Sequence, residues 1–358
     1  VSTTVQRVDS TGLDANLAAT SGTQEDLVTT ANGAIVITVS AGDLTLNGGS
    51  SSANNALTAT GSGNVRLDAA GNLALNSAVD AGAGHISLIA GGNVTQAAAG
   101  DVSTSAGHVD VEASGAVTMT DGATITTTDG NIRLNITGDL ALGALSSTNG
   151  HVSLIANSIT DSGTTDTDVA AQNLRISVTG VAGGFGTTGN HMETAVANLS
   201  ANVGTSGLFI TEADAITVTE LAAITTNRVK ADGAITGSSN TDVAQSDLIS
   251  TGAGVLQTTA GSVTIAEGDA DDTGVSVAGN LLLQAGGATS DLVLNADVSS
   301  SAGHISLNAG QDVLQNADVS TATASKTIDV LAARNVTMAD GTGITTNAGD
   351  ARIEATAG

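Results

Sequence analysis

The chain of 358 residues contains no cysteine, proline, tryptophan or tyrosine. Phe185 and Phe209 are its only phenylalanines, so it has two large aromatic side chains in all. Disulfide bonds are excluded, and any core must be thin and filled with Val, Ile, Leu and Ala. The absence of proline suits interior strands, because each of these must donate backbone hydrogen bonds to its neighbours.

Basic residues are also scarce. Nine Lys and Arg stand against 35 Asp and Glu, which gives a formal net charge of −26. Nucleic acid is therefore excluded as a partner, because phosphate binding needs clustered positive charge. An anionic membrane surface is excluded for the same reason. No apolar run approaches the roughly 20 residues that span a bilayer, so we expect no membrane insertion of this segment.

A short unit that begins with glycine and continues as an alternating apolar strand recurs every 20–24 residues or so. Glycine, Asn, Asp, Ser and Thr supply the turns between these short strands. Units of this length are typical of stacked solenoids, in which no repeat buries its apolar face alone. The clearest copies are Gly84-His85-Ile86-Ser87-Leu88, Gly107-His108-Val109-Asp110-Val111, Gly130-Asn131-Ile132-Arg133-Leu134 and Gly150-His151-Val152-Ser153-Leu154.

These patterns predict an all-β protein, a parallel β-helix with about 20–24 residues per coil. Antiparallel hairpins would instead need paired strands joined by two-residue loops. Like positions of successive coils should stack about 4.8 Å apart, which gives about 16 coils over roughly 75 Å. No sustained 3.6-residue apolar period is present, so we expect almost no helix.

A longer repeat lies above the short unit. Residues 1–139 match residues 220–358 at an offset of about 219, so that Gly303-His304-Ile305-Ser306-Leu307 repeats Gly84-His85-Ile86-Ser87-Leu88. We expect one continuous solenoid over residues 1–358. Because residues 140–219 have no counterpart, the chain does not hold a whole number of long repeats and is expected to be part of a longer array. The segment 160–218 is glycine-rich and is expected to form irregular coils, with a candidate lateral loop that could bind a partner. Its candidate binding residues are Gly183, Phe185, Asn190 and His191.

The strand-turn units, together with Thr194-Ala195-Val196-Ala197-Asn198-Leu199-Ser200-Ala201, resemble the giant bacterial surface proteins of the filamentous-haemagglutinin-like type. The resemblance covers nearly the whole chain but rests on degenerate repeats. It implies an extracellular location on the bacterial cell surface, a right-handed β-helical shaft, and roles in adhesion or the biofilm matrix. The handedness comes from this resemblance alone.

Three groups of residues could bind metal. Glu267, Asp269, Asp271 and Asp272 gather four carboxylates in one turn, which suits calcium, although the spacing matches no EF-hand. The stretch from Asp161 to Asp168, which contains Asp166 and Asp168, is a second calcium candidate. The alternative for both stretches is a solvated acidic loop. The histidines that follow the repeated glycine could share a cation, but a turn position that accepts His and Asn equally is the simpler interpretation.

We expect no enzymatic activity. Polysaccharide-active β-helices use basic residues or paired carboxylates, whereas the arginines here fall in different units and no nucleophile motif is present. The first hypothesis is a structural fibre or shaft whose coils stack end to end with another copy or with more of a longer chain. A ligand-binding adhesin segment that attaches to cell-surface glycans is the alternative, and a polysaccharide-active enzyme is the third.

Overall fold

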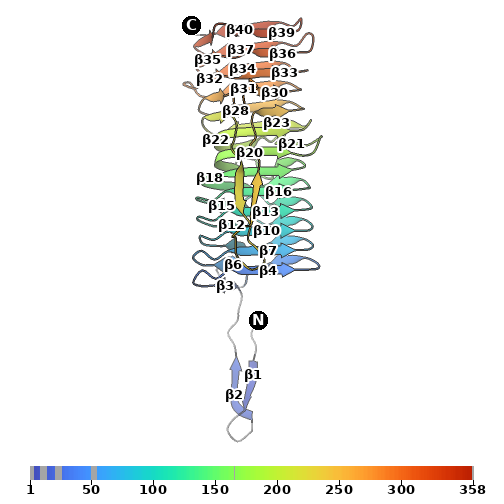
Figure 1. Cartoon of the computed structure of the whole chain (residues 1–358), viewed down its shortest axis with the longest axis vertical. Helices are drawn as coiled ribbons and strands as arrows, with labels where there is room; N and C mark the ends of the chain where they lie inside the picture. Colours follow the sequence, from blue (N-terminus) through green and yellow to red (C-terminus); the bar gives the residue numbers. More distant parts are fainter. Residues whose placement is uncertain (1–3, 9–13, 21–25, 50–54, 165, 357–358) are drawn as a thin grey trace.

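The computed structural model describes residues 4–8, 14–20, 26–49, 55–164 and 166–356. It confirms the all-β prediction: the described residues contain no helix, and their strands stack as parallel coils of a β-solenoid (Figure 1). The stack has about 13 turns. The expected 16 coils were too many, because residues 219–247 leave the stack and the coils begin only at Leu27.

Each coil has three sides, and every side is a ladder of parallel strands. The first side contains β4 (Ile35–Val39), β7 (Val65–Ala69), β10 (Ile86–Ala90), β13 (Val109–Ala113), β16 (Ile132–Ile136), the ends of β18 (Ala144–Ala156), β20 (Val169–Val178) and β22 (Met192–Val203), then β27 (Leu248–Ser250), β30 (Thr273–Val277), β33 (Asp297–Ser300), β36 (Val319–Thr321) and β39 (Ile344–Thr346).

The second side contains β5 (Leu44–Leu46), β8 (Leu73–Leu75), β11 (Val94–Gln96), β14 (Val117–Met119), β17 (Leu140–Leu142), β19 (Ile159–Asp161), β21 (Gly184–Phe185), β23 (Gly207–Glu212), β28 (Gly254–Thr258), β31 (Leu281–Ala285), β34 (Ile305–Ala309), β37 (Ile328–Ala332) and β40 (Ala351–Ala355). The third contains β3 (Leu27–Thr29), β6 (Asn55–Ala59), β9 (Ala78–Asp80), β12 (Val102–Ser103), β15 (Thr124–Thr127), the starts of β18, β20 and β22, then β24 (Ile216–Val218), β29 (Val263–Ile265), β32 (Leu292–Leu294), β35 (Asp312–Gln315) and β38 (Asn335–Met338).

The core follows from the alternation of apolar residues along each strand. Val65, Ile86, Val109 and Ile132 pair in one ladder and are fully buried, because alternate side chains of a strand point to opposite faces. Full burial of each such side chain contributes about 1.5–3 kcal/mol. Phe185 is also fully buried, so it fills the core.

The glycine of the short unit forms a corner at which successive backbones approach closely. A Cβ atom on Gly107 would overlap the carbonyl oxygen of Gly84, one coil below. The hydroxyl of Thr104 donates to that same carbonyl at 2.7 Å. The corner therefore needs glycine because the backbone of the neighbouring coil occupies the space of a side chain.

The long repeat does not return to the same side of the solenoid. Strand β10, with its His85-Ile86-Ser87 start, lies on the first side, whereas its repeat β34 lies on the second. Eight turns and one further side separate the two strands. After one long repeat of about 219 residues, the equivalent strand therefore lies on the next side of the solenoid.

The change of side takes place above β22. The start of β22 pairs with β23, its middle pairs with β24 and its end pairs with β27. At the gap between β23 and β24, the buried carboxylate of Glu212 accepts hydrogen bonds from Thr194 Oγ1 at 2.6 Å and from the amides of Val196 and Ala213. Glu212 therefore supplies the acceptors that a regular ladder would provide with backbone carbonyls.

Residues 219–247 leave the stack at this level and form the flank hairpin, in which β25 (Ile224–Asn227) pairs antiparallel with β26 (Ser239–Asp242). Figure 1 shows both strands, in yellow, lying along the stack and across the strands of the coils. The large lateral excursion therefore follows the segment 160–218, whose strands β20, β22, β23 and β24 continue the ladders. A second antiparallel hairpin, β1 (Thr4–Val8) and β2 (Asp14–Thr20), lies beyond the first coil (Figure 1).

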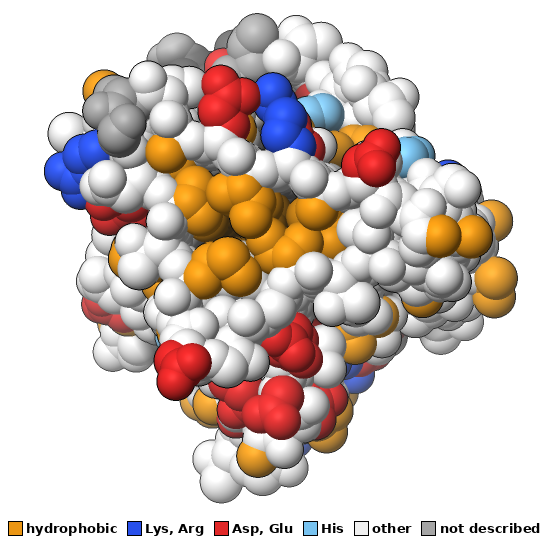
Figure 2. Space-filling view, turned by 90° about the horizontal axis from the view of Figure 1, so that it is seen from above, with side chains coloured by type: hydrophobic (Ala, Val, Ile, Leu, Met, Phe, Trp, Pro, Cys, Tyr) orange, Lys and Arg blue, Asp and Glu red, His pale blue; other side chains and the backbone are white. Residues whose placement is uncertain are grey.

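The last described coil leaves part of the core uncovered. Met338 is 38% exposed and Ile353 is 50% exposed. Figure 2 looks onto this end and shows apolar side chains lining a central hollow. In the described part of the chain, no helix is long and apolar enough to cross a membrane.

Candidate functional sites

The flank hairpin covers one continuous row of outward-facing side chains, which we call the docking ladder. These residues pair from coil to coil at the second position of the repeated strand on the first side. They are Val36, Arg66, Ser87, Asp110, Arg133, Ser153, Arg175 and Ser200.

Contacts run along the whole length of the hairpin. Near its tip, the Asn64 amide donates to Gly233 O at 2.9 Å, and Val229 N donates to Ser87 Oγ at 2.9 Å. Near its base, Ser200 Oγ donates to Ser246 O at 2.9 Å. Because contacts at both ends tie the hairpin to coils far apart in the stack, it bridges those coils.

The centre of this interface is a buried network of charges. Arg133 binds Asp110 through Nη1 at 3.1 Å and Asp242 through Nε at 2.9 Å, while Arg228 Nε binds the other oxygen of Asp110 at 3.0 Å. Glu112 contacts both arginines. Buried charges are tolerated when they are paired and hydrogen-bonded in this way.

Burial sets the protonation behaviour of the network. Desolvation raises the pKa of Asp110, although the guanidinium groups of Arg228 and Arg133 oppose this rise. For Arg133, attraction to Asp242 and Asp110 outweighs desolvation and raises its pKa. The network therefore depends on both partners of each pair, since a guanidinium left alone at this depth would face the desolvation cost without compensation.

The histidines of the repeat act as backbone caps. His85 Nδ1 accepts a hydrogen bond from His108 N, and His108 Nδ1 accepts one from Asn131 N, both at 2.9 Å. Asn131 Oδ1 continues the row by accepting from His151 N at 3.0 Å. The rings of His85 and His108 stack with centroids 5.2 Å apart. With both Nδ1 atoms engaged, the geometry supports the simpler interpretation of the row as a turn position shared by His and Asn.

The structure brings two of the four predicted calcium ligands together. Carboxylate oxygens of Asp269 and Asp271 lie within 4.8 Å of each other and of Asp247, which the sequence analysis missed. Glu267 instead accepts hydrogen bonds from the amides of Ala270 and Asp271, and Asp272 is outside the group. Burial raises the pKa of Asp247, and Asp269 and Asp271 add to the effect. Three oxygens at this spacing could bind a hard cation.

A second acidic group includes two residues of the predicted stretch from Asp161 to Asp168, together with Glu193, which the sequence did not indicate. Asp161, Asp168 and Glu193 hold carboxylate oxygens within 4.8 Å of one another, and Asp168 is buried. Burial raises the pKa of Asp168 to about 9, and its hydrogen bond with Asp161 raises it as well. The carboxyl of Asp168 is therefore protonated at neutral pH unless a cation replaces its proton.

The candidate binding loop does not form one site. Phe185 lies in the core and Gly183 packs closely over Asn157, whereas Asn190 binds Asp161 at 2.8 Å and His191 contacts Thr211. Asn190 also donates to Gly163 O at 2.9 Å. These contacts hold the loop against the stack. Gly183 and Phe185 are buried, whereas Asn190 and His191 are half-buried, so the four residues do not form one exposed surface.

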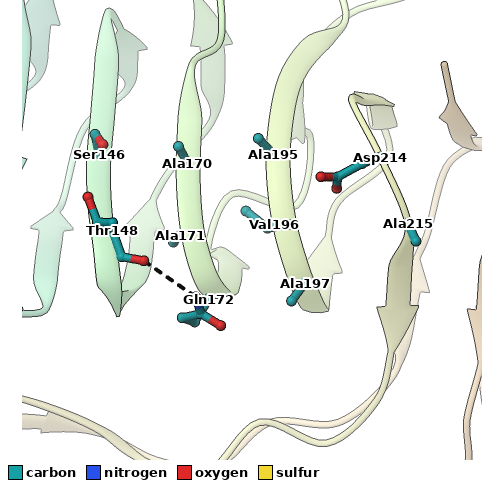
Figure 3. Close-up of a pocket in the computed structure, with 10 residues that line it drawn as sticks. All are labelled: Ser146, Thr148, Ala170, Ala171, Gln172, Ala195, Val196, Ala197, Asp214 and Ala215. Carbon is teal, nitrogen blue, oxygen red and sulfur yellow. Dashed lines mark hydrogen bonds between the residues drawn. The ribbon is translucent and has the colours of Figure 1, made fainter. Parts of the chain in front are cut away.

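A shallow hollow of about 540 Å³ lies on the third side, where β18, β20 and β22 run side by side (Figure 3). Ala170, Ala171 and Ala195 form much of its floor, while Gln172 and Asp214 lie at its margin. Small side chains leave room there for a ligand.

The sequence did not predict that the residues of the docking ladder form one row. Arg66, Arg133 and Arg175 fall in different units, yet stacking places them in one row under the hairpin. The available signal was their shared position, the second residue of each repeated strand. Their partner Asp242 carried no such signal, because it lies outside the repeat pattern.

The chain matches no protein-family model, and comparisons with curated proteins and with solved structures likewise find no match.

Proposed function

We propose that this chain is a structural shaft, a segment of an extracellular bacterial fibre or surface protein that acts by stacking β-coils end to end. The observation that supports this most directly is the unbroken set of parallel ladders from β3 to β40, with one continuous aliphatic core. Backbone hydrogen bonds along the stack resist both bending and extension.

The flank hairpin adds to the stiffness. It joins coils from the level of Asn64 to the level of Ser200 through side-chain and backbone contacts. A bend between these coils would have to break the buried network around Arg133. The resemblance to filamentous-haemagglutinin-like proteins supports a role outside the bacterial cell.

Electron microscopy of the purified chain tests this proposal. We expect single rods of uniform width, and end-to-end filaments as the concentration rises, because Met338 and Ile353 leave apolar surface at one end. The double variant Met338→Lys/Ile353→Lys should keep the rods and lose the filaments. Compact particles, or filaments that this variant forms equally well, would contradict the proposal.

A ligand-binding adhesin segment is the second candidate, and the hollow of Figure 3 favours it. Asp214 and Gln172 could hydrogen-bond sugar hydroxyls at its margin. Ala170→Trp would fill the hollow from a half-buried position on the same floor, in register with Ser146 and Ala195. If a glycan array detects ligands of the unmodified chain that this variant no longer binds, the adhesin role is supported; an array without ligands argues for the shaft alone.

A further inference from the structure

The long repeat recreates much of the docking ladder on the C-terminal half, where no described residue covers it. Five polar residues of the N-terminal half have an identical counterpart at the same position of the C-terminal strands: Asn64 and Asn280, His85 and His304, Ser87 and Ser306, Asp110 and Asp329, Arg133 and Arg352. We call the row formed by Val255, Leu282, Ser306, Asp329 and Arg352 the bare ladder.

The bare ladder is open to solvent. The side chains of Asp329 and Arg352 are 42% and 59% exposed, whereas those of Asp110 and Arg133 are 0% and 8% exposed under the flank hairpin. A hollow of about 430 Å³ is lined by Val255, Leu282 and Ser306 among others. Arg352 meets Asp329 and Glu354 only, so it lacks the partner that Asp242 provides to Arg133.

The chain also carries a second hairpin of the required kind. The sequence from Thr4 to Val28 aligns with that from Thr225 to Ile249, with identical residues that include Arg7 and Arg228, Val8 and Val229. Both hairpins are antiparallel and share their register over three pairs, since Thr4 pairs with Thr20 and Thr225 pairs with Thr241. Beyond these pairs the register of β1 and β2 shifts between Gln6 and Arg7. Each is followed at once by an Asp-Leu pair that begins a coil, Asp26-Leu27 or Asp247-Leu248.

We propose that the bare ladder is the docking face for the β1–β2 hairpin of a second copy of this chain. In the covered half, Arg228 binds Asp110 and Val229 N binds Ser87. The equivalent pairs are Arg7 with Asp329 and Val8 with Ser306. Two copies would thereby join head to tail, with the N-terminal hairpin of one lying along the C-terminal coils of the other.

The differences between the two halves predict a weaker contact than that of the flank hairpin. Ser21 stands in sequence where the flank hairpin has Asp242, so the charged partner of Arg133 has no counterpart for Arg352. Leu282 and Leu331 replace Arg66 and Glu112, which exchanges ionic contacts for apolar ones. We therefore expect reversible association that weakens at high salt, because its one intermolecular ion pair is screened.

Engineered cysteines test this directly, because the chain has none of its own. Arg7→Cys and Asp329→Cys are introduced into separate full-length chains, which are then mixed under mild oxidation. We expect disulfide-linked dimers from this pair and a yield at least tenfold lower from Arg7→Cys with Thr337→Cys, an exposed position on the third side. Equal yields from the two pairs would overturn the proposal.

Charge reversal supplies the second measurement. Sedimentation should show association lost in Arg7→Glu and regained when Arg7→Glu is mixed with Asp329→Arg, with circular dichroism to confirm that each variant is folded. Failure of the mixture to regain association would overturn the proposal. So would binding of a peptide of residues 219–247 to the bare ladder without any cross-link from Arg7→Cys, since the occupant would then be a different hairpin.

The inference rests on the proposed shaft, but the two can fail separately. Rods that form filaments equally well with Arg7→Glu would leave the shaft standing and remove the hairpin contact. Dimers cross-linked through Arg7→Cys and Asp329→Cys, in a sample that forms no rods, would support the hairpin contact and contradict the shaft.

Discussion

The two halves of the solenoid carry the same repeat in two different environments. In the N-terminal half, Arg133 and Asp110 lie under the flank hairpin, whereas their counterparts Arg352 and Asp329 lie in solvent. Both arginines bind the equivalent aspartate one coil below. The same residue pair is thus part of a buried network in one half and a surface ion pair in the other, and what covers it decides its energetic role.

The repeated strand changes side above β22, where β23, β24 and β27 pair with different parts of that strand. This region, which we call the junction, produces the difference between the two halves. Because one period advances the repeated strand from the first side to the second, the flank hairpin that descends from the junction covers only the N-terminal copy of the ladder. The hairpin concentrates basic residues in an acidic chain: Arg66, Arg133, Arg175 and Arg228 all contact or belong to it. The C-terminal copy keeps the coil and loses this cover.

The largest expected effect separates the halves through matched arginine variants. Arg133→Met should lower the free energy of unfolding by about 3–5 kcal/mol, because it leaves the carboxylate of Asp242 buried without its cation and leaves Asp110 with Arg228 alone. Arg352→Met should change it little, since solvent hydrates Asp329 in its place. Urea unfolding followed by circular dichroism measures both. Equal losses for the two variants would show that the cover does not matter.

Glu212→Ala tests whether the buried carboxylate stabilises the change of side at the junction. The substitution removes the carboxylate that accepts from the buried amide of Val196 and the buried hydroxyl of Thr194, so we expect a loss of about 2–3 kcal/mol in the free energy of unfolding. Glu354→Ala, at an exposed position of the C-terminal half, is the control and should be close to neutral. If Glu212→Ala proves as mild as its control, the carboxylate does not hold the change of side.

A glycine pair tests what the halves share. Gly84→Ala and Gly303→Ala should each lower the free energy of unfolding by about 1–3 kcal/mol, because the new Cβ overlaps a carbonyl of the coil below in both halves. Gly189→Ala, where a Cβ meets open space, is the control. Thermal unfolding of the three variants should give two similar losses and one unchanged curve. A loss in only one half would mean that the corner differs between them.

The sequence predicted the coil well because its signal is local and repeated. The alternation of apolar residues in each unit, such as Gly84-His85-Ile86-Ser87-Leu88, predicts which residues face inward. The structure keeps this alternation in successive strands. The turn position shared by His and Asn at the corner followed from the same repetition, whereas the close approach of the neighbouring backbone that requires glycine there did not. The number of turns was overestimated because length alone does not reveal which residues leave the stack.

The buried network was beyond sequence reasoning for a physical reason. Arg133 and Asp242 are 109 residues apart, and nothing local says that residues 219–247 fold back along the flank. Likewise Asp247 joins Asp269 and Asp271 only because the hairpin returns to the stack beside the next turn. The change of side also depends on which strands pair between coils, and the 219-residue spacing of the long repeat contains no information about this pairing.

Acid should weaken the histidine row of the N-terminal half. Burial, with a contribution from His108, lowers the pKa of His85 to about 4. Since the folded chain binds the proton less well than the unfolded chain, stability is full above about pH 6.5 and falls as the pH drops toward 4. We expect a loss on the order of 1 kcal/mol, after allowance for the partial exposure of the ring.

Urea midpoints between pH 7 and pH 4 measure this loss. His85→Asn is the matched variant, because Asn64 and Asn131 already perform the same capping in neighbouring coils. It should retain the midpoint at pH 7 and show a smaller decline on acidification. The same decline in the variant and the parent would assign the pH dependence to other groups.

The smallest expected effect concerns the two acidic groups, one at the junction and one just above it. If calcium binds Asp247, Asp269 and Asp271, 10 mM Ca²⁺ should raise the melting temperature by about 2 °C, given the millimolar affinity of sites with few ligands. Asp271→Asn should abolish the rise, whereas Asp168→Asn should abolish it only if the ion sits in the group of Asp161, Asp168 and Glu193. A melting temperature that neither Ca²⁺ nor excess chelator changes would leave both groups as solvated carboxylates. The two substitutions therefore decide whether cation binding belongs to the turn of Asp269 and Asp271 or to the group of Asp161, Asp168 and Glu193, where burial raises the pKa of Asp168 to about 9.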